Sequence, residues 1–150
     1  MIYLFLFYVF LGCMCYDIVR IPDEDIQYLN ERLQMKEYMN EEDAFNTIVE
    51  LENFYTAIKL GIKGEPSEMI DKAWHAHILN TPMYFKFSEI VFGKYLHHLP
   101  FWSGNILTSA DANLVSPAKS VYKRLEQLGV QCMNKTVWTF RYPKMMSMDD

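Results

Sequence analysis

The sequence lacks several features that assign proteins to common classes. Three cysteines among 150 residues are too few for a disulfide-rich scaffold. The formal net charge is −5, so the chain lacks the excess of positive charge with which nucleic-acid binders displace counterions. The sequence contains neither a glycine-rich phosphate-binding loop nor a Gly-x-Ser-x-Gly nucleophile turn. These absences argue against a dedicated nucleic-acid binder, a P-loop nucleoside triphosphatase and an α/β-hydrolase.

Apolar and aromatic residues are abundant instead. Hydrophobic residues make up 51% of the chain and aromatic residues 15%. A chain of this composition would not remain unfolded in water, and 150 residues are enough to form one domain with its own core. The sequence therefore predicts a single folded domain.

The N-terminal segment Met1–Tyr16 is an apolar run without any charged side chain. As a helix it would be about 24 Å long at about 1.5 Å per residue, shorter than the roughly 30 Å hydrocarbon core of a bilayer. Three interpretations stay open: a cleaved signal peptide ending near Cys13 and Cys15, an uncleaved anchor flanked by Arg20, or a buried first helix. The signal peptide would lack the usual basic residue at its start. We expect a hydrophobic leader or membrane anchor at residues 1–16 that leaves the globular domain.

Helical patterns dominate the rest of the chain. N-cap residues, amphipathic spacing and terminal glycines predict an all-α, compact helical bundle over residues 22–142, followed by a flexible tail at 143–150. Residues 137–142 suit a short C-terminal strand or an extended arm. The predicted helices run from Asp23 to Tyr38, from Asn40 to Gly61, from Ser67 to Asn80, from Thr81 through the apolar segment around Gly93, and from Ser116 to Gly129.

Histidine placement is the sharpest chemical signal. All four histidines, His75, His77, His97 and His98, lie within 24 residues. Asp71 precedes His75 by one helical turn, so the two side chains share a helix face, whereas His77 is rotated by about 200° and cannot share an ion with His75. A site built from Asp71, His75 and either His97 or His98, with water as a fourth ligand, would suit zinc. This hypothesis requires the second helix to break near Gly93, because a straight helix would carry both later histidines too far away.

A structural interpretation competes with the metal site. An aspartate one turn before a histidine commonly forms an ordinary hydrogen bond in a partly buried position. The hydroxyls Ser67 and Ser88 and the thiol Cys132 show no spacing typical of a nucleophile–base pair, so the sequence predicts no catalytic residue. The aromatic residues around the histidines are most simply core.

The chain also resembles a known family through a long ordered motif. The motif consists of Asp71-Lys72-Ala73-Trp74-His75-Ala76-His77-Ile78-Leu79, then Tyr84, then Phe92-Gly93-Lys94-Tyr95-Leu96-His97-His98-Leu99-Pro100. It is similar to the glycine-rich domain-containing-protein-like family, and the resemblance covers about Phe45 to Pro100. The resemblance implies a compact helical domain in which Trp74, His77 and Tyr84 are structural motif residues, and it implies no settled activity. Members of that family occur in plants, fungi, bacteria and large DNA viruses.

Two functions follow as hypotheses. The first is a non-enzymatic interaction or structural module, membrane-associated through Met1–Tyr16 or exported, with a protein partner or a larger assembly such as a virus particle. The alternative is a metal-binding protein or metal-dependent hydrolase that holds zinc with its Asp/His cluster. If the chain is exported by a eukaryotic route, Asn134 in Asn-Lys-Thr is a candidate N-glycosylation site.

Overall fold

The computed structural model describes residues 17–98 and 118–139. The predicted all-α bundle is confirmed, and these residues contain no strand. The predicted leader at 1–16, the stretch 100–115, for which the sequence predicts a loop, and the tail at 143–150 lie outside the described residues. The helices are α1 (Asp23–Glu37), α2 (Glu41–Lys59), α3 (Glu68–Leu79), α4 (Thr81–Phe92), α6 (Ala118–Gln127) and α7 (Lys135–Thr139).

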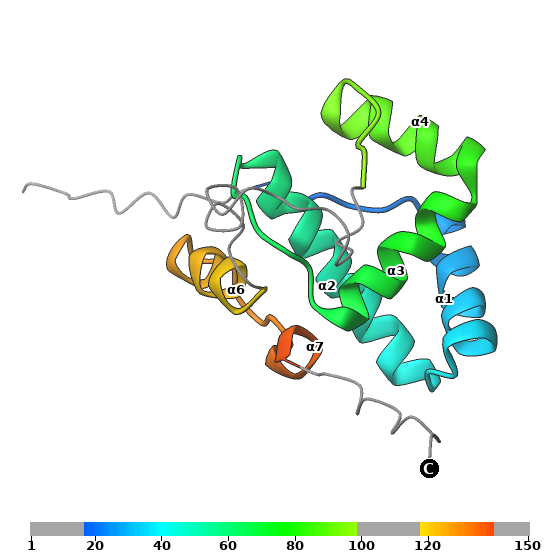
Figure 1. The fold of residues 1–150 in the computed structure, drawn as a ribbon, viewed down its shortest axis with the longest axis horizontal. Coiled ribbons are helices and arrows are strands. Elements are labelled where there is room, and N and C mark those ends of the chain that lie inside the picture. The colour runs from blue at the N-terminus through cyan, green and yellow to red at the C-terminus, as the bar shows by residue number, and fades with distance from the viewer. Residues whose placement is uncertain (1–16, 99–117, 140–150) are drawn as a thin grey trace, which may run out of the picture.

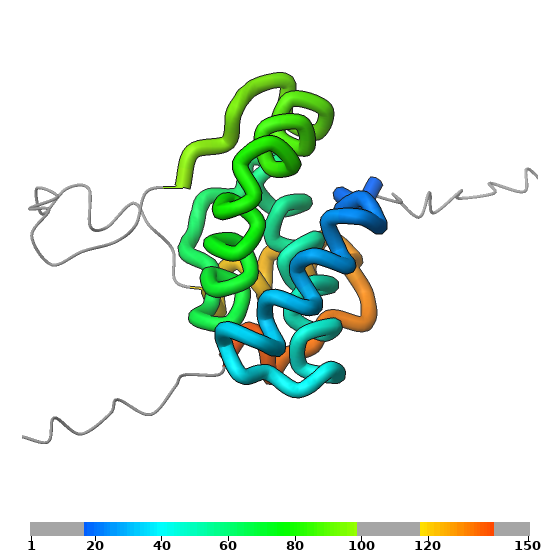
Figure 2. The backbone as a smooth tube through the Cα atoms, turned by 90° about the vertical axis from the view of Figure 1, so that its right-hand side faces the viewer, coloured from blue at the N-terminus to red at the C-terminus, as the bar shows by residue number. Residues whose placement is uncertain are grey.

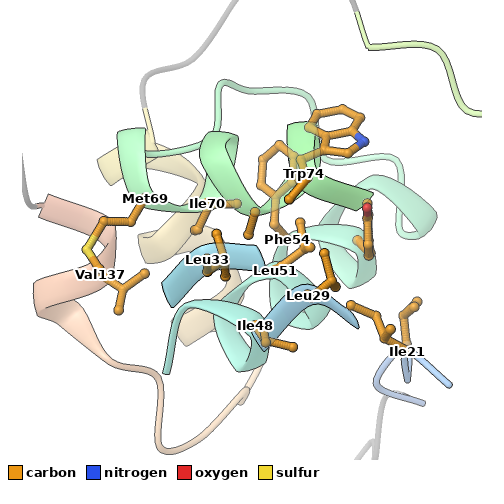
Figure 3. Packing of buried hydrophobic residues seen from close by; sticks show 14 of the residues in the cluster. Ile21, Leu29, Leu33, Ile48, Leu51, Phe54, Met69, Ile70, Trp74 and Val137 are labelled. Carbon is orange, nitrogen blue, oxygen red and sulfur yellow. The ribbon is translucent and has the colours of Figure 1, made fainter. Parts of the chain in front are cut away.

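Helix α2 lies at the centre of the bundle. Helices α1 and α3 pack against it and against each other, and α6 and α7 pack beside it further along the chain (Figures 1 and 2). Helix α4 follows α3 after a sharp corner and lies at one end of the molecule (Figure 1). The core in Figure 3 combines Leu29 and Leu33 of α1, Ile48, Leu51 and Phe54 of α2, and Ile70 and Trp74 of α3.

Local capping sets the helix boundaries, as the sequence predicted. The side chain of Asn40 accepts a hydrogen bond of 2.7 Å from the Asp43 N–H at the start of α2, and Ser67 Oγ accepts one of 3.3 Å from the Ile70 N–H at the start of α3. Tyr38 ends α1 in the left-handed conformation with φ 55°. Short polar side chains thus satisfy amide groups that a helix terminus leaves without a partner.

Helix α4 ends at Gly93, which confirms the predicted break. Gly93 has φ 67°, a left-handed conformation that glycine adopts without steric cost, and its N–H donates to the Glu89 carbonyl at 3.0 Å. The next residues, 94–98, are not helical and turn back toward the bundle (Figure 1). The break therefore returns the chain to α3.

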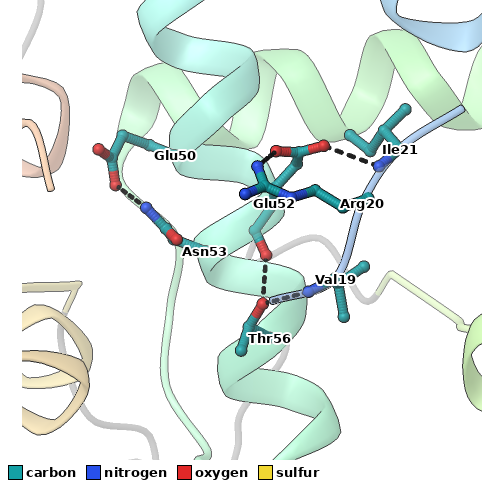
Figure 4. A network of polar contacts seen from close by, with 7 residues as sticks. All are labelled: Val19, Arg20, Ile21, Glu50, Glu52, Asn53 and Thr56. Atoms are coloured by element: carbon teal, nitrogen blue, oxygen red, sulfur yellow. Dashed lines mark hydrogen bonds and ion pairs between the residues drawn. The ribbon is translucent and has the colours of Figure 1, made fainter. Parts of the chain in front are cut away.

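The segment before α1 is tied to α2 by polar contacts (Figure 4). The backbone N–H of Val19 donates to Thr56 Oγ1 at 2.9 Å, and that of Ile21 donates to Glu52 Oε1 at 2.8 Å. Arg20 forms an ion pair of 2.8 Å with the other oxygen of the buried Glu52. These contacts replace the hydrogen bonds that a strand partner would otherwise supply to an extended segment.

The alternative of a short strand beginning at residue 137 is wrong, because residues 135–139 form α7. The neighbouring residues Val137 and Trp138 are both buried, whereas successive side chains of a strand point to opposite faces. The Trp138 indole N–H donates to Glu50 Oε2 at 2.6 Å, and Glu50 also accepts from the Asn134 N–H and the Asn53 side chain. The helical turn brings the Asn134 N–H and the Trp138 indole N–H to the same buried carboxylate on α2.

No helix within residues 17–98 and 118–139 combines the length and the apolar character needed to span a bilayer.

Candidate metal centre

Helix α3 presents Asp71 and His75 on one face. Its N-cap at Ser67 sets the register, and the two side chains lie one turn apart. His75 Nε2 lies 3.6 Å from Asp71 Oδ2, which is slightly beyond hydrogen-bonding distance. The predicted direct hydrogen bond between these two side chains is therefore not formed, although they are close enough to contribute to one site.

The direct hydrogen-bond partner of Asp71 is His98. His98 Nε2 lies 2.7 Å from Asp71 Oδ1, and the rings of His75 and His98 are 4.6 Å apart between centroids. Asp71, His75 and His98 each offer a ligand atom, and these atoms all lie within 4.8 Å of one another. The two histidine-bearing segments therefore converge, as the zinc hypothesis requires, and His98 is the residue that meets α3.

The three side chains differ in their exposure to solvent. The side chain of His98 is 8% exposed, while those of Asp71 and His75 are 36% and 49% exposed. Trp74 is buried beside them, as predicted, and its ring meets the His98 ring edge-on at 4.3 Å. The cluster therefore has an enclosed side at His98 and an open side at His75.

His97 lies outside this cluster. Its ring contacts the ring of Tyr95 at 4.9 Å between centroids, and it is absent from the group of close ligand atoms found among the described residues. Of the two adjacent histidines, His98 contacts Asp71 of α3, whereas His97 contacts Tyr95. The sequence left this choice open, and the structure selects His98.

His77 lies in the buried core and outside the candidate metal site. It is fully buried, its Nδ1 lies 2.9 Å from the Tyr55 hydroxyl, and its Nε2 lies 3.0 Å from Asp25 Oδ2. Burial lowers the pKa of His77, while Asp25 partly opposes that shift, and burial raises the pKa of Tyr55 well above 10. From this network we assign a neutral imidazole whose Nε2–H donates to Asp25 and whose Nδ1 accepts from Tyr55.

Asp25 is a partner that sequence reasoning missed. It lies 52 positions before His77, in the first turn of α1, where three consecutive residues are acidic. That position is typical of an acidic residue interacting with the helix dipole, so no local pattern distinguishes Asp25 from Asp23 or Glu24. Asp25 is the one of the three that is buried, because α1 packs against α3.

The candidate glycosylation residue Asn134 lies directly before α7. Its side-chain oxygen accepts a hydrogen bond of 3.1 Å from the Thr136 N–H, and its own N–H donates to the buried Glu50. The side chain therefore has a capping role in the fold. N-glycosylation of Asn134 stays a prediction.

The arrangement fits a divalent transition-metal ion. Two imidazoles and one carboxylate are ligands that zinc and related ions accept. Zinc bonds of about 2.1 Å place tetrahedral ligand atoms about 3.4 Å apart, so small side-chain rotations from the observed positions would suffice. If His98 Nε2 is the coordinating atom, its proton and its hydrogen bond to Asp71 must give way to the ion, which makes binding compete with this hydrogen bond.

Comparison with known proteins identifies a family model that matches the chain. The model of the UCP032817-like family matches residues 23–117, which is more than half of the chain. No curated protein and no solved structure gives a significant match. The family match corrects the interpretation of the Asp71–Pro100 motif: the resemblance to the glycine-rich domain-containing-protein-like family is wrong.

Proposed function

The chain belongs to the UCP032817-like family, and we propose that this helical domain binds a divalent transition-metal ion, zinc in the first instance, through Asp71, His75 and His98. The observation that supports the proposal is the approach of three ligand atoms to within 4.8 Å of one another, from two segments that are distant in sequence. Chance clusters of exposed acidic residues are common, but this cluster contains two histidines and one of them is nearly buried.

The open side of the cluster favours an exchangeable site over a purely structural one. Structural zinc sites are closed by four protein ligands, whereas reactive sites use three protein ligands and leave a position for water or substrate. Asp71 and His75 are more than one-third exposed, so water can complete the coordination shell. Bound zinc would lower the pKa of a coordinated water, to about 7 in known zinc hydrolases, and that activated water is the chemistry on which metal-dependent hydrolysis rests.

Zinc titration of the purified chain by calorimetry tests the proposal, together with elemental analysis of protein purified without chelators. We expect one ion per chain and a loss of at least tenfold in affinity for His75→Ala. His75 is the best ligand to replace, because it is half exposed and its removal leaves the core intact. His97→Ala is the matched control, since it removes a neighbouring histidine outside the cluster and should bind zinc like the unchanged chain. Equal zinc binding by His75→Ala and the unchanged chain would refute the proposal.

A second candidate function is the interaction module, membrane-associated or exported and acting with a protein partner or a larger assembly. It is supported by exposed apolar side chains on and beside α4: Phe85 is 55% exposed, Ile90 is 73% exposed, and Leu79 at the end of α3 is 61% exposed. Scattered exposed apolar residues are normal, but three large ones at one end of the bundle suit a contact surface.

Sedimentation with anionic phospholipid vesicles tests this second function. The full chain is compared with the double variant Phe85→Ser, Ile90→Ser, whose substitutions lie on the surface and should preserve the fold. Reduced sedimentation of the variant would support a membrane-facing α4. Equal sedimentation would show that α4 does not contribute, and no sedimentation of either protein would contradict membrane association.

A further inference from the structure

The third ligand of the proposed metal site lies on a segment without regular secondary structure. Asp71 and His75 belong to α3, whose backbone hydrogen bonds fix the relative positions of their Cα atoms. His98 follows Gly93 in the non-helical segment 94–98. A metal site needs its ligands held within a fraction of an ångström, so something must fix this segment against α3.

A relay of two hydrogen bonds joins that segment to α3. The Trp74 indole N–H donates to the Tyr84 hydroxyl oxygen at 2.9 Å, and the Tyr84 O–H donates to the carbonyl oxygen of Leu96 at 2.7 Å. Leu96 is two residues before His98. One buried hydroxyl therefore connects the helix that contributes two ligands with the segment that contributes the third.

The surroundings of Tyr84 preserve the donor and acceptor roles of its hydroxyl, which accepts from Trp74 and donates to Leu96. Its side chain is fully buried, and burial raises its pKa to about 12, so the hydroxyl keeps its proton at neutral pH and can donate to Leu96. The ring of Tyr95 packs against it edge-on at 5.4 Å. Trp74 also contacts His98 directly, because the centroids of its ring and of the His98 imidazole lie 4.3 Å apart.

We propose that Trp74 and Tyr84 are positioning residues that hold His98 against Asp71 and His75, and thereby set the affinity of the metal site. The metal part of this inference rests on the proposed function, whereas the positioning of His98 does not. Tyr84→Phe removes both hydrogen bonds of the relay and keeps the ring. The Leu96 carbonyl then loses its buried donor, and the segment that contains His98 loses its anchor. Removal of a group that orients a metal ligand typically weakens binding by about 10–100-fold.

A double-mutant cycle on the purified full chain tests the metal part. Zinc affinity is measured for the unchanged chain, Tyr84→Phe, His98→Ala and the double variant, with Tyr95→Phe as the matched control. We expect Tyr84→Phe to weaken binding at least tenfold in the unchanged background and to have no further effect once His98 is absent. Tyr95→Phe removes a hydroxyl from the adjacent ring and should leave the affinity unchanged. An equal loss from Tyr84→Phe in both backgrounds would overturn the inference, because the effect would then not pass through His98.

Nuclear magnetic resonance of the metal-free chain tests the positioning of His98 separately. The Trp74 ring, 4.3 Å from the His98 ring between centroids, should shift the ring-proton signals of His98 in the unchanged protein, and Tyr84→Phe should move these signals toward random-coil values. Movement of the signals in a chain that binds no zinc would reject the metal function and support the positioning of His98. Unchanged His98 signals in a folded Tyr84→Phe variant would overturn the positioning role, whatever the zinc affinity.

Discussion

His98 Nε2 lies 2.7 Å from Asp71 Oδ1, although the two residues are 27 positions apart. This hydrogen bond joins the two ends of a chain segment that begins on α3, includes α4 and turns back after Gly93. It brings the only nearly buried imidazole of the candidate site against the only carboxylate of that site. Metal binding at the proposed site would therefore be coupled, through this pair of side chains, to the position of segment 94–98 against α3.

Zinc should stabilise the folded chain. A ligand that binds only the folded state adds about 2.7 kcal/mol to the free energy of unfolding at a concentration 100 times its Kd. We expect zinc to raise the Tm of the unchanged chain and a chelator to reverse the rise. The Tm of His75→Ala should not respond to the same zinc concentration. A rise of equal size in both proteins would place the ion elsewhere on the molecule.

Gly93→Ala should destabilise the fold and loosen the site. A Cβ at Gly93 meets no neighbouring atom within 4 Å, so the cost comes from the backbone conformation alone. A left-handed conformation costs a residue with a Cβ roughly 1–2 kcal/mol, and asparagine tolerates it better. Urea denaturation should show a loss of about 1 kcal/mol for Gly93→Ala and a smaller loss for Gly93→Asn. Equal stability of all three proteins would contradict the left-handed backbone conformation at this position.

Glu50→Ala should be strongly destabilising. The buried Glu50 accepts hydrogen bonds from Trp138, Asn53 and Asn134, and its removal leaves these donors without an acceptor. An unsatisfied buried donor costs about 1–3 kcal/mol, so we expect a loss of at least about 2 kcal/mol by urea denaturation. Hydrogen exchange should show that α7 opens first. The control Glu42→Ala removes an exposed carboxylate of the same helix and should change the stability by less than about 0.5 kcal/mol.

The buried His77 should make stability depend on pH. Burial lowers its pKa in the folded state below the unperturbed value of about 6.5, so below that pH the unfolded chain binds the proton more readily. Its contribution to the free energy of unfolding is therefore complete above about pH 6.5 and decreases as the pH falls toward the lowered pKa. Urea denaturation between pH 7.5 and about 5.5 should give a smaller loss for His77→Gln than for the unchanged chain. His97→Gln should retain the full dependence, and an identical slope for His77→Gln would refute this explanation.

Much of the fold was predictable because its signals are local. Asn40 and Ser67 are short side chains that accept from amides three residues away, so their capping role is visible in the sequence. Gly93 ends α4 for an equally local reason, since glycine adopts a left-handed conformation that other residues avoid. The predicted break between the two histidine-bearing segments followed from this residue alone.

The C-terminal prediction failed where a distant contact determines the outcome. Residues 137–142 contain β-branched and aromatic residues that favour strands in isolation. The structure makes residues 135–139 helical because Asn134 and Trp138 both donate to Glu50 of α2. No propensity scale includes an acceptor more than 80 positions away.

The sequence by itself determined the helical class, the caps, the break at Gly93 and the shared face of Asp71 and His75, because each depends on residues within about one helical turn. Only the tertiary structure decided which of His97 and His98 joins the cluster. It also placed Asp25 in a buried contact with His77, and the Tyr84 hydroxyl between Trp74 and Leu96. These relationships join residues that are 10 to 52 positions apart. They arise when helices pack and buried polar groups find partners, which local patterns in a single sequence do not encode.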